Sequence, residues 1–274
     1  ARMSLSVLLT DLFRDHETEN RKHRLQVSLA STPEEIRAAQ RLRYQVFVDE
    51  MGARLKTEEP GIESDRYDDY CQHLIVRDLA AGSVVGCYRI LTDLQAVRAG
   101  GFYSQSEFDL TRVLALPGRI MEVGRTCVHP DHRTGAVIAL LWQGLARFMV
   151  MNRFDYLMGC ASIPLRHGTG EALALYRELA RTHLAPPEWR VYPRVPLPQV
   201  NLAGVSAKPR TPPLIKAYLR MGVKICGDPC WDPHFNVADL FILLLGTAIA
   251  ADFDLRQAFW DKMKKVESRE ARMI

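Results

Sequence analysis

Charged residues crowd one short stretch of the sequence, IMEVGRTCVHPDHRTGAV, which covers residues 120–137. Its first half is apolar enough for a buried strand, and its second half opens an apolar helical pattern. Gly124 lies in mid-strand, where a glycine often marks a bulge or the close approach of a ligand. Strict alternation places Glu122 on the same face as Gly124 and on the face opposite to Arg125, unless a bulge intervenes.

Two kinds of chemistry fit this stretch. A carboxylate in an apolar strand either forms a structural ion pair or is held for proton transfer, and Glu122 is the candidate for a general base. A strand that ends in a basic, glycine-containing turn and opens a helix can bind an anion, because free backbone N–H groups and the positive helix end face the ligand. The alternative for the turn is a capped loop with solvated charges.

The elements that must position these residues form a mixed α/β pattern with a central sheet. Thr32, Pro33 and Glu35 form a capping-box start for a helix that ends at Gly52. We expect strands over residues 25–30, 73–78, 83–91, 119–128, 155–163, 223–227 and 237–246. We expect further helices over residues 3–20, 135–153, 170–184, 212–222 and 255–274, with short helices between 92 and 119.

The composition limits the class of protein. The chain has 274 residues, of which 47% are hydrophobic and 25% are charged, and these values fit one large or two small globular domains. The net charge of +4 comes without a nucleic-acid-binding motif, so it suits an acidic partner such as an anionic membrane surface or an acidic carrier protein. The apolar run at 240–251 is too short to span a membrane.

Six cysteines are scattered along the chain, several of them in apolar runs, as is typical of reduced and buried thiols. Cys226 and Cys230 are four positions apart, which is not the usual spacing of a zinc-binding pair, and we expect no metal. No signal-peptide pattern opens the sequence, so we expect a cytoplasmic location, with contact to the inner face of the membrane as an option.

The turn after residue 128 resembles the donor-binding motif of the GNAT-type N-acetyltransferase fold, where this turn cradles the pyrophosphate of coenzyme A. Arg133 and Gly135 match that motif, while Ala136 and Val137 stand where it has a second small residue. This departure leaves the phosphopantetheine of a carrier protein open beside coenzyme A. The resemblance implies a GNAT-type mixed sheet flanked by helices. It assigns donor binding to Val128, Arg133, Thr134, Gly135 and Ala136.

Four further motifs resemble one branch of that fold, the acyl-homoserine-lactone synthases. RLRYQVFVDEMG (41–52) is similar to their arginine helix, and ESDRYDDY (63–70) is similar to their acidic loop. VVGCYRIL (84–91) and EVGR (122–125) are similar to two of their strands. The resemblance singles out Arg43, Asp65, Asp68, Arg89, Glu122 and Arg125.

Two later stretches are LLWQGLARFM (140–149) and PPLIKAYLRMGVKICGDPCWDPHFNVADLFILL (212–244). They resemble the ornithine-lipid acyltransferases, often labelled haemolysin-like proteins, and this likeness covers roughly residues 25–245. The resemblance implies transfer of a 3-hydroxyacyl chain from acyl carrier protein to the α-amine of ornithine, by direct attack in a ternary complex. Glu122 is then the general base and Tyr218 a candidate general acid. Asp65 and Asp68 are expected to hold the cationic acceptor, and Arg43, Arg89 or Arg125 its carboxylate. The alternative is that these arginines and aspartates pair with each other.

Other functions stay open at this point. One is an acyl-homoserine-lactone-like synthase or an N-acyltransferase for another amine, and a different class is a membrane-active haemolysin-like protein. The expected organisation is a helical extension over residues 1–24, an acyltransferase domain over 25–250 and an amphipathic basic helix over 251–274. No tightly bound cofactor is expected, because the acyl-phosphopantetheine is a substrate.

Overall fold

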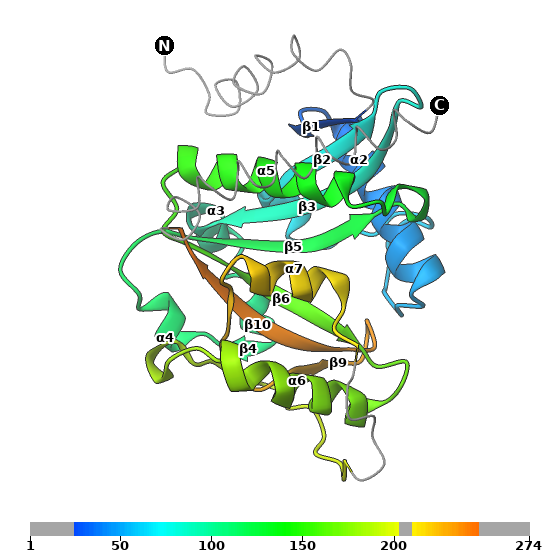
Figure 1. The fold of residues 1–274 in the computed structure, drawn as a ribbon. Coiled ribbons are helices and arrows are strands. Elements are labelled where there is room, and N and C mark those ends of the chain that lie inside the picture. Colours follow the sequence, from blue (N-terminus) through cyan, green and yellow to red (C-terminus); the bar gives the residue numbers. More distant parts are fainter. Residues whose placement is uncertain (1–24, 203–209, 247–274) are drawn as a thin grey trace, which may run out of the picture.

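A mixed sheet of eight strands runs through residues 25–202 and 210–246, the part of the chain that the computed structural model describes (Figure 1). The strand order is β1-β2-β3-β5-β6-β10-β8, and β9 pairs with β10. All neighbouring strands are antiparallel except β5 and β6, which are parallel. The expected mixed α/β fold with a central sheet and flanking helices is confirmed.

The bounds of the elements agree with most of the predicted ones. The strands of the main sheet are β1 (Leu25–Leu29), β2 (Gln72–Asp78), β3 (Ser83–Thr92), β5 (Ile120–Val128), β6 (Tyr156–Pro164), β8 (Lys224–Ile225), β9 (Cys230–Asp232) and β10 (Val237–Leu245). The helices are α2 (Pro33–Tyr44), α3 (Asp93–Arg98), α4 (Thr111–Leu114), α5 (Ala136–Met151), α6 (Thr169–His183) and α7 (Pro213–Arg220). Five short helical segments are η1 (Gln45–Glu50), η2 (Asp68–Tyr70), η3 (Tyr103–Ser106), η4 (Pro130–His132) and η5 (Pro187–Trp189).

Three short strands were not predicted. They are β9 and the two strands of a small separate sheet, β4 (Phe108–Asp109) and β7 (Tyr192–Pro193). The helices expected over residues 3–20 and 255–274 lie outside the described residues, as does the expected domain boundary at 250. None of the described helices is both long and apolar enough to cross a lipid bilayer.

The first long helix begins as its sequence predicts and changes form before its end. Thr32 accepts a hydrogen bond from the backbone N–H of Glu35, and the Glu35 carboxylate accepts one from the backbone of Thr32. The α-helix was expected to continue to Gly52, but it gives way after Tyr44 to the wider π-helical turn η1. A π-helical turn of this kind is frequent at functional sites.

Helices cover both faces of the sheet (Figure 1). Residues of α5, α6 and α7 pack into one large apolar cluster with the sheet residues Leu74, Tyr88 and Val123. Residues of α2 pack on the opposite face, against Ile75 and Cys87. Successive residues of a strand point to opposite faces of the sheet. Because helices pack on both faces, both are buried.

The two parallel strands β5 and β6 pair over only three residues. The register joins Ile120 to Tyr156, Met121 to Leu157 and Glu122 to Met158, and it ends there. Beyond these residues β5 keeps its other neighbour, β3, and β6 keeps β10. The sheet is therefore split between the carboxyl-terminal halves of β5 and β6, and Glu122 lies at the vertex of the split.

Candidate active site

A cavity of about 620 Å³ lies where β5 and β6 separate. This volume is within the usual range for small-molecule sites. Glu122 to Val128 of β5 form one wall, and Gly159, Cys160, Ser162 and Pro164 of β6 form another. The split thus opens a space between two neighbouring strands, where hydrogen bonds would join them in a regular sheet.

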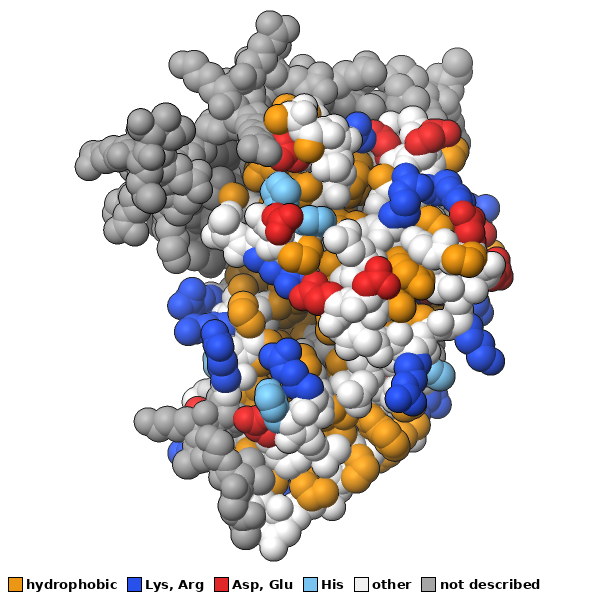
Figure 2. Space-filling model, turned by 90° about the vertical axis from the view of Figure 1, so that its right-hand side faces the viewer, with side chains coloured by type: hydrophobic (Ala, Val, Ile, Leu, Met, Phe, Trp, Pro, Cys, Tyr) orange, Lys and Arg blue, Asp and Glu red, His pale blue; other side chains and the backbone are white. Residues whose placement is uncertain are grey.

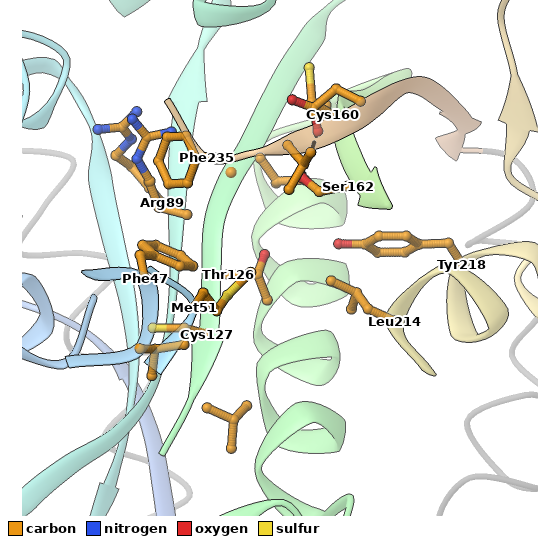
Figure 3. A pocket seen from close by; sticks show the side chains of 18 of the residues that line it. Phe47, Met51, Arg89, Thr126, Cys127, Cys160, Ser162, Leu214, Tyr218 and Phe235 are labelled. Carbon is orange, nitrogen blue, oxygen red and sulfur yellow. Dashed lines mark hydrogen bonds between the residues drawn. The ribbon is translucent and has the colours of Figure 1, made fainter. Parts of the chain in front are cut away.

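Side chains from both faces of the sheet reach this cavity. Tyr218 and Leu214 of α7 enter from the face covered by α5, and Arg89, Phe47 and Phe235 lie on the other side of β5 (Figure 3). A ligand in the cavity can therefore contact groups on both faces of the sheet.

Gly159 keeps the two strands close at the vertex. A Cβ atom at this position would overlap the backbone carbonyl oxygen of Val123 on β5. Any side chain there would force the strands apart just beyond the last paired residues, Glu122 and Met158. This close approach explains the glycine of β6 in physical terms.

The Glu122 carboxylate is buried and held by three donors from η3. Its Oε2 accepts a hydrogen bond from the backbone N–H of Tyr103 at 2.7 Å, and its Oε1 accepts one from the N–H of Ser104 at 2.8 Å and another from the Ser104 hydroxyl. Only 4% of Glu122 is exposed, yet it lines the cavity. The three donors fix the orientation of the carboxylate.

Burial raises the pKa of Glu122, although the hydrogen bonds from Ser104 and Tyr103 oppose this rise. Among the described residues, no lysine or arginine forms an ion pair with it. The structural ion pair considered from the sequence is therefore not the role of this side chain. A raised carboxyl pKa moves the group toward the neutral range in which a general base is most effective.

A β-bulge changes the direction of Arg125. The register between β3 and β5 shifts between the pairs Cys87–Cys127 and Arg89–Gly124, and Arg125 has a φ of 51°. A positive φ is uncommon for a residue with a side chain, and it typically occurs at a bulge or another special site. Strict alternation fails here, so Arg125 does not lie on the face opposite to Glu122.

The residues predicted to bind the acceptor meet each other instead. Arg43 contacts Glu63 and donates to Asp68 at 2.7 Å. Arg89 donates to Asp65 at 2.6 Å and to Asp68 at 3.2 Å. The network of three arginines and three carboxylates is completed by Arg125, which donates to Glu63 and Asp65, each at 3.0 Å.

The two aspartates of this arginine–carboxylate network stay ionised. Burial alone would raise the pKa values of Asp65 and Asp68, but the neighbouring arginines hold both below their ordinary value. Arg89 and Arg125 line the cavity, whereas Arg43, Asp65 and Asp68 lie behind them. The motifs of the sequence therefore converge in space. Of the five network residues that were predicted from the sequence, only Arg89 and Arg125 face the cavity.

Tyr218 faces β5 across the cavity (Figure 3). Its hydroxyl lies 2.6 Å from the hydroxyl of Tyr88 on β3, and its ring packs edge-on against Trp142 of α5. Burial raises the pKa of Tyr218 to about 12. The phenol is therefore protonated at neutral pH and can serve as a proton donor.

The predicted donor turn lies at the open end of the split. Val128, Arg133 and Gly135 line the cavity, while Thr134 and Ala136 do not. Gly135 has a φ of 100°, which glycine adopts without strain, and it precedes the first residue of α5. The first turn of α5 has neither a side-chain cap nor an acidic residue, so its backbone N–H groups remain available to an anion.

Arg133 is exposed and paired with Glu50 of η1 by two hydrogen bonds of 2.6 Å. Both side chains are about two-fifths exposed, and exposed pairs contribute little stability. Figure 2 shows charged side chains of both signs on the face of the molecule to the right of Figure 1. Arg133 can therefore exchange its partner for a phosphate at small cost.

Three carboxylates in the cavity wall were missed by the sequence analysis. Glu107, Asp232 and Asp239 each offer an oxygen atom within 4.8 Å of the others. One signal was available, because Asp239 interrupts the apolar run of β10. Glu107 is far from it in the sequence, and Asp232 ends β9, a short strand that was not predicted. Cys226 and Cys230, considered for zinc, are not part of this group.

Comparisons with known proteins support an acyltransferase fold. Residues 42–143 match the family model described as an acetyltransferase (GNAT) domain. The chain is 38% identical over 245 residues to an L-ornithine N(alpha)-acyltransferase of Agrobacterium fabrum, covering 84% of this chain and 83% of that protein. It is 39% identical over 234 residues to a protein of the same name from Rhodobacter capsulatus, covering 80% and 89%.

Among solved structures, the fold is similar to that of FeeM, an N-acyl amino acid synthase from uncultured soil microbes. The TM-score is 0.49 at 14% sequence identity, and the match covers 82% of this chain and 93% of that one. A similar likeness holds for BjaI, a coenzyme A-dependent acyl-homoserine lactone synthase, with a TM-score of 0.49 at 17% identity over 80% and 81% of the two chains.

Proposed function

Because this chain belongs to the family of the L-ornithine N(alpha)-acyltransferases, we propose that it transfers an acyl chain from a thioester donor to the α-amine of ornithine. The observation that carries this proposal is the position of Glu122. It is a buried, oriented and unpaired carboxylate at the vertex of a split sheet, next to a cavity that opens toward an anion-binding turn.

The proposed reaction is a direct attack in a ternary complex. The amine nitrogen forms a bond to the thioester carbonyl carbon, and the carbon–sulfur bond breaks. Glu122 takes the proton that the amine loses, either directly or through a water molecule. Tyr218 gives a proton to the departing thiolate, and its position across the cavity from β5 supports this role.

The donor in this proposal is the acyl-phosphopantetheine of acyl carrier protein, with acyl coenzyme A as the alternative. Both carry a phosphate that the uncapped start of α5 and Arg133 can bind. The net charge of +4 suits an acidic carrier protein. A 3-hydroxyacyl chain is the expected cargo, as the family resemblance implies.

The acceptor carboxylate binds at Arg89 and Arg125 in this proposal. Both guanidinium groups line the cavity, and a guanidinium suits a carboxylate because it can donate two parallel hydrogen bonds. Arg43, Asp65 and Asp68 then act by holding these two arginines in place, since Asp65 pairs with both of them, Asp68 pairs with Arg89, and Arg43 pairs with Asp68.

Mass spectrometry of a defined reaction tests the proposal. The purified protein is incubated with 3-hydroxyacyl carrier protein or 3-hydroxyacyl coenzyme A and with an equimolar pool of amino acids. A product with the mass of 3-hydroxyacyl-ornithine is expected. Acylation of another amine would replace ornithine as the acceptor, and consumption of S-adenosylmethionine would indicate a lactone synthase. Absence of product from both donors would contradict the proposal.

A further inference from the structure

Three separate elements bring the carboxylates of Glu107, Asp232 and Asp239 to one place in the cavity wall. Glu107 lies between η3 and β4, Asp232 ends β9, and Asp239 is on β10. One carboxylate oxygen from each residue lies within 4.8 Å of the other two. Such a cluster of like charges needs either a proton or a cation to be stable.

No arginine or lysine among the described residues forms an ion pair with these three carboxylates, in contrast to Glu63, Asp65 and Asp68. Asp239 accepts a hydrogen bond of 2.6 Å from the Ser162 hydroxyl. Asp232 accepts two from the backbone N–H groups of His234 and Phe235.

Glu107 is the least satisfied member of the cluster. Its Oε2 atom is buried and has no hydrogen-bond partner among the residues that the structure describes. A buried polar atom without a partner is costly, so it usually marks a place where a ligand or water completes the site. The cavity beside it supplies the space for such a ligand.

The electrostatics also favour a cation. Burial, together with the charges of Asp239 and Asp232, raises the pKa of Glu107 to about 9. Burial raises the pKa of Asp239 to about 6, and the charge of Asp232 adds to the rise. The hydrogen bonds with Ser162 and with Glu107, and the charge of Arg125, oppose it. A cation bound between these carboxylates would take over the role of the protons.

The cluster lies close to Glu122. The Ser104 hydroxyl contacts both Glu122 and, at 3.3 Å, the sulfur of Cys160, and the Cys160 thiol in turn forms a hydrogen bond with Glu107. Two small side chains therefore separate the proposed base from the cluster. The two nitrogen atoms of a 2,5-diamino acid are five bonds apart and span about 6 Å when extended, which is a separation of the same order.

We propose that Glu107, Asp232 and Asp239 bind the distal ammonium group of the acceptor and thereby select diamino acids over neutral amino acids. This inference rests on the proposed acyl transfer to an amino acid and names the part of the cavity that recognises the side chain. An ammonium group carries three N–H donors, which match three carboxylate acceptors. With its distal amine held there, the α-amine of the acceptor is free to reach Glu122.

Calorimetric titration in the absence of donor tests this subsite. The ligands are L-ornithine and L-norvaline, which has the same carbon chain without the distal amine. The variants Asp239→Asn and Glu107→Gln each remove one carboxylate, and Asp109→Asn, an exposed carboxylate on β4, is the matched control. The wild type and the control should bind ornithine at least about tenfold more tightly than norvaline.

Each cavity variant should lose most of this preference by weakening ornithine binding, while its affinity for norvaline stays the same. Equal affinities of the wild type for the two ligands, or an unchanged preference in both variants, would overturn the subsite. A site that binds Ca²⁺ or Mn²⁺ in the wild type, with ornithine binding unaffected by the substitutions, would overturn it as well. Thermal unfolding shows whether each variant folds. If one of the two does not fold, the other still tests the subsite.

The outcomes separate this inference from the proposed function. Formation of acyl-ornithine by variants that still discriminate against norvaline would leave the activity in place and remove the subsite. Loss of the ornithine preference in the variants of a protein that forms no acyl-ornithine would keep the subsite and remove the proposed reaction.

Discussion

Glu122 and Arg125 are three positions apart on β5, and both contact Tyr103. The Glu122 carboxylate accepts the Tyr103 backbone N–H, and the Arg125 guanidinium lies 4.8 Å from the centre of the Tyr103 ring. The bulge at Arg125 makes this possible, because regular alternation would point the two side chains to opposite faces. The proposed base and a proposed carboxylate-binding group therefore share one side of the cavity.

Replacement of Glu122 by Gln should lower kcat by about 10²- to 10⁴-fold, the usual contribution of a general base. The amide is nearly the same size, so the variant should fold, although its NH₂ group cannot accept the hydrogen bonds from η3. Initial rates of acyl-ornithine formation and circular dichroism spectra measure the two effects. Near-normal turnover by a folded variant would remove Glu122 from the proposed reaction.

The matched variant is Ser104→Ala, which keeps the carboxylate and removes one hydrogen bond to it. Activity should rise with pH as Glu122 loses its proton. Because the bond from Ser104 lowers the pKa of Glu122, its loss should move this rise to higher pH. A pH profile of kcat/KM that is identical in the wild type and Ser104→Ala would argue against Glu122 as the titrating group.

Tyr218→Phe should reduce kcat more than Tyr88→Phe does. Both substitutions break the same 2.6 Å contact between hydroxyl groups, so they should have similar effects on stability. Only Tyr218 lines the cavity and can give a proton to the thiolate. Parallel measurement of kcat and of the melting temperature distinguishes a chemical role from a packing role. Equal losses of kcat in the two variants would point to packing alone.

Arg43→Ala should destabilise the protein by about 3–5 kcal/mol, because the buried carboxylates of Glu63 and Asp68 each lose one of their two arginine partners. Arg43 is only 1% exposed. The matched control is Arg37→Ala on the same helix, whose pair with Glu59 is exposed and should contribute at most about 1 kcal/mol. Urea unfolding of both variants measures the difference, and similar stabilities would show that the buried network is not structural.

Arg133→Ala should raise KM for the acyl donor, with a smaller effect on KM for the acceptor. Glu50→Gln is the complementary change, because it frees Arg133 from its ion pair and should lower KM for the donor. Both effects should weaken with added salt, since these groups are exposed. Donor saturation curves at two salt concentrations measure this, and opposite shifts in the two variants are the expected result.

The contribution of Glu107 to the stability of the protein should fall as pH rises from about 4.5 to about 9. Glu107 keeps its proton in the folded state up to about pH 9, but in the unfolded chain it loses that proton near its ordinary pKa of 4.5. The free energy of unfolding therefore decreases through this window. Glu107→Gln should flatten the dependence in urea unfolding at pH 5, 7 and 8.5. The exposed Asp109→Asn, whose pKa is lowered by its hydrogen bonds with Thr111, should not.

Much of the fold could be predicted because its signals are local. The cap at Thr32 and the strand–turn–helix around Gly135 follow from neighbouring residues, and both appear where expected. The π-helical end of the first helix was not predicted, and it carries Phe47, whose ring packs edge-on against Phe235, almost two hundred residues away. The β-bulge was recognised only as an option at Gly124.

The candidate site was predictable in part, because some of its residues lie in short local motifs. Motifs identified Glu122, Arg89 and Arg125, which line the cavity, but they could not show that Asp65 and Asp68 are occupied by arginines. That outcome depends on the fold of the loop between α2 and β2. The three carboxylates of the proposed ammonium subsite come from distant segments, so only the folded chain reveals that they meet.

The split between β5 and β6 leaves two strand edges inside the molecule. Among the described strands, β5 beyond Glu122 and β6 beyond Met158 have no partner on the sides that face each other. Strand edges carry rows of backbone N–H and C=O groups that readily bind another extended chain. In the proposed reaction, the phosphopantetheine arm of the donor, which contains two amide groups, would join these edges as a short added strand. Its recognition would then be a property of the backbone, tolerant of changes in the side chains of both strands.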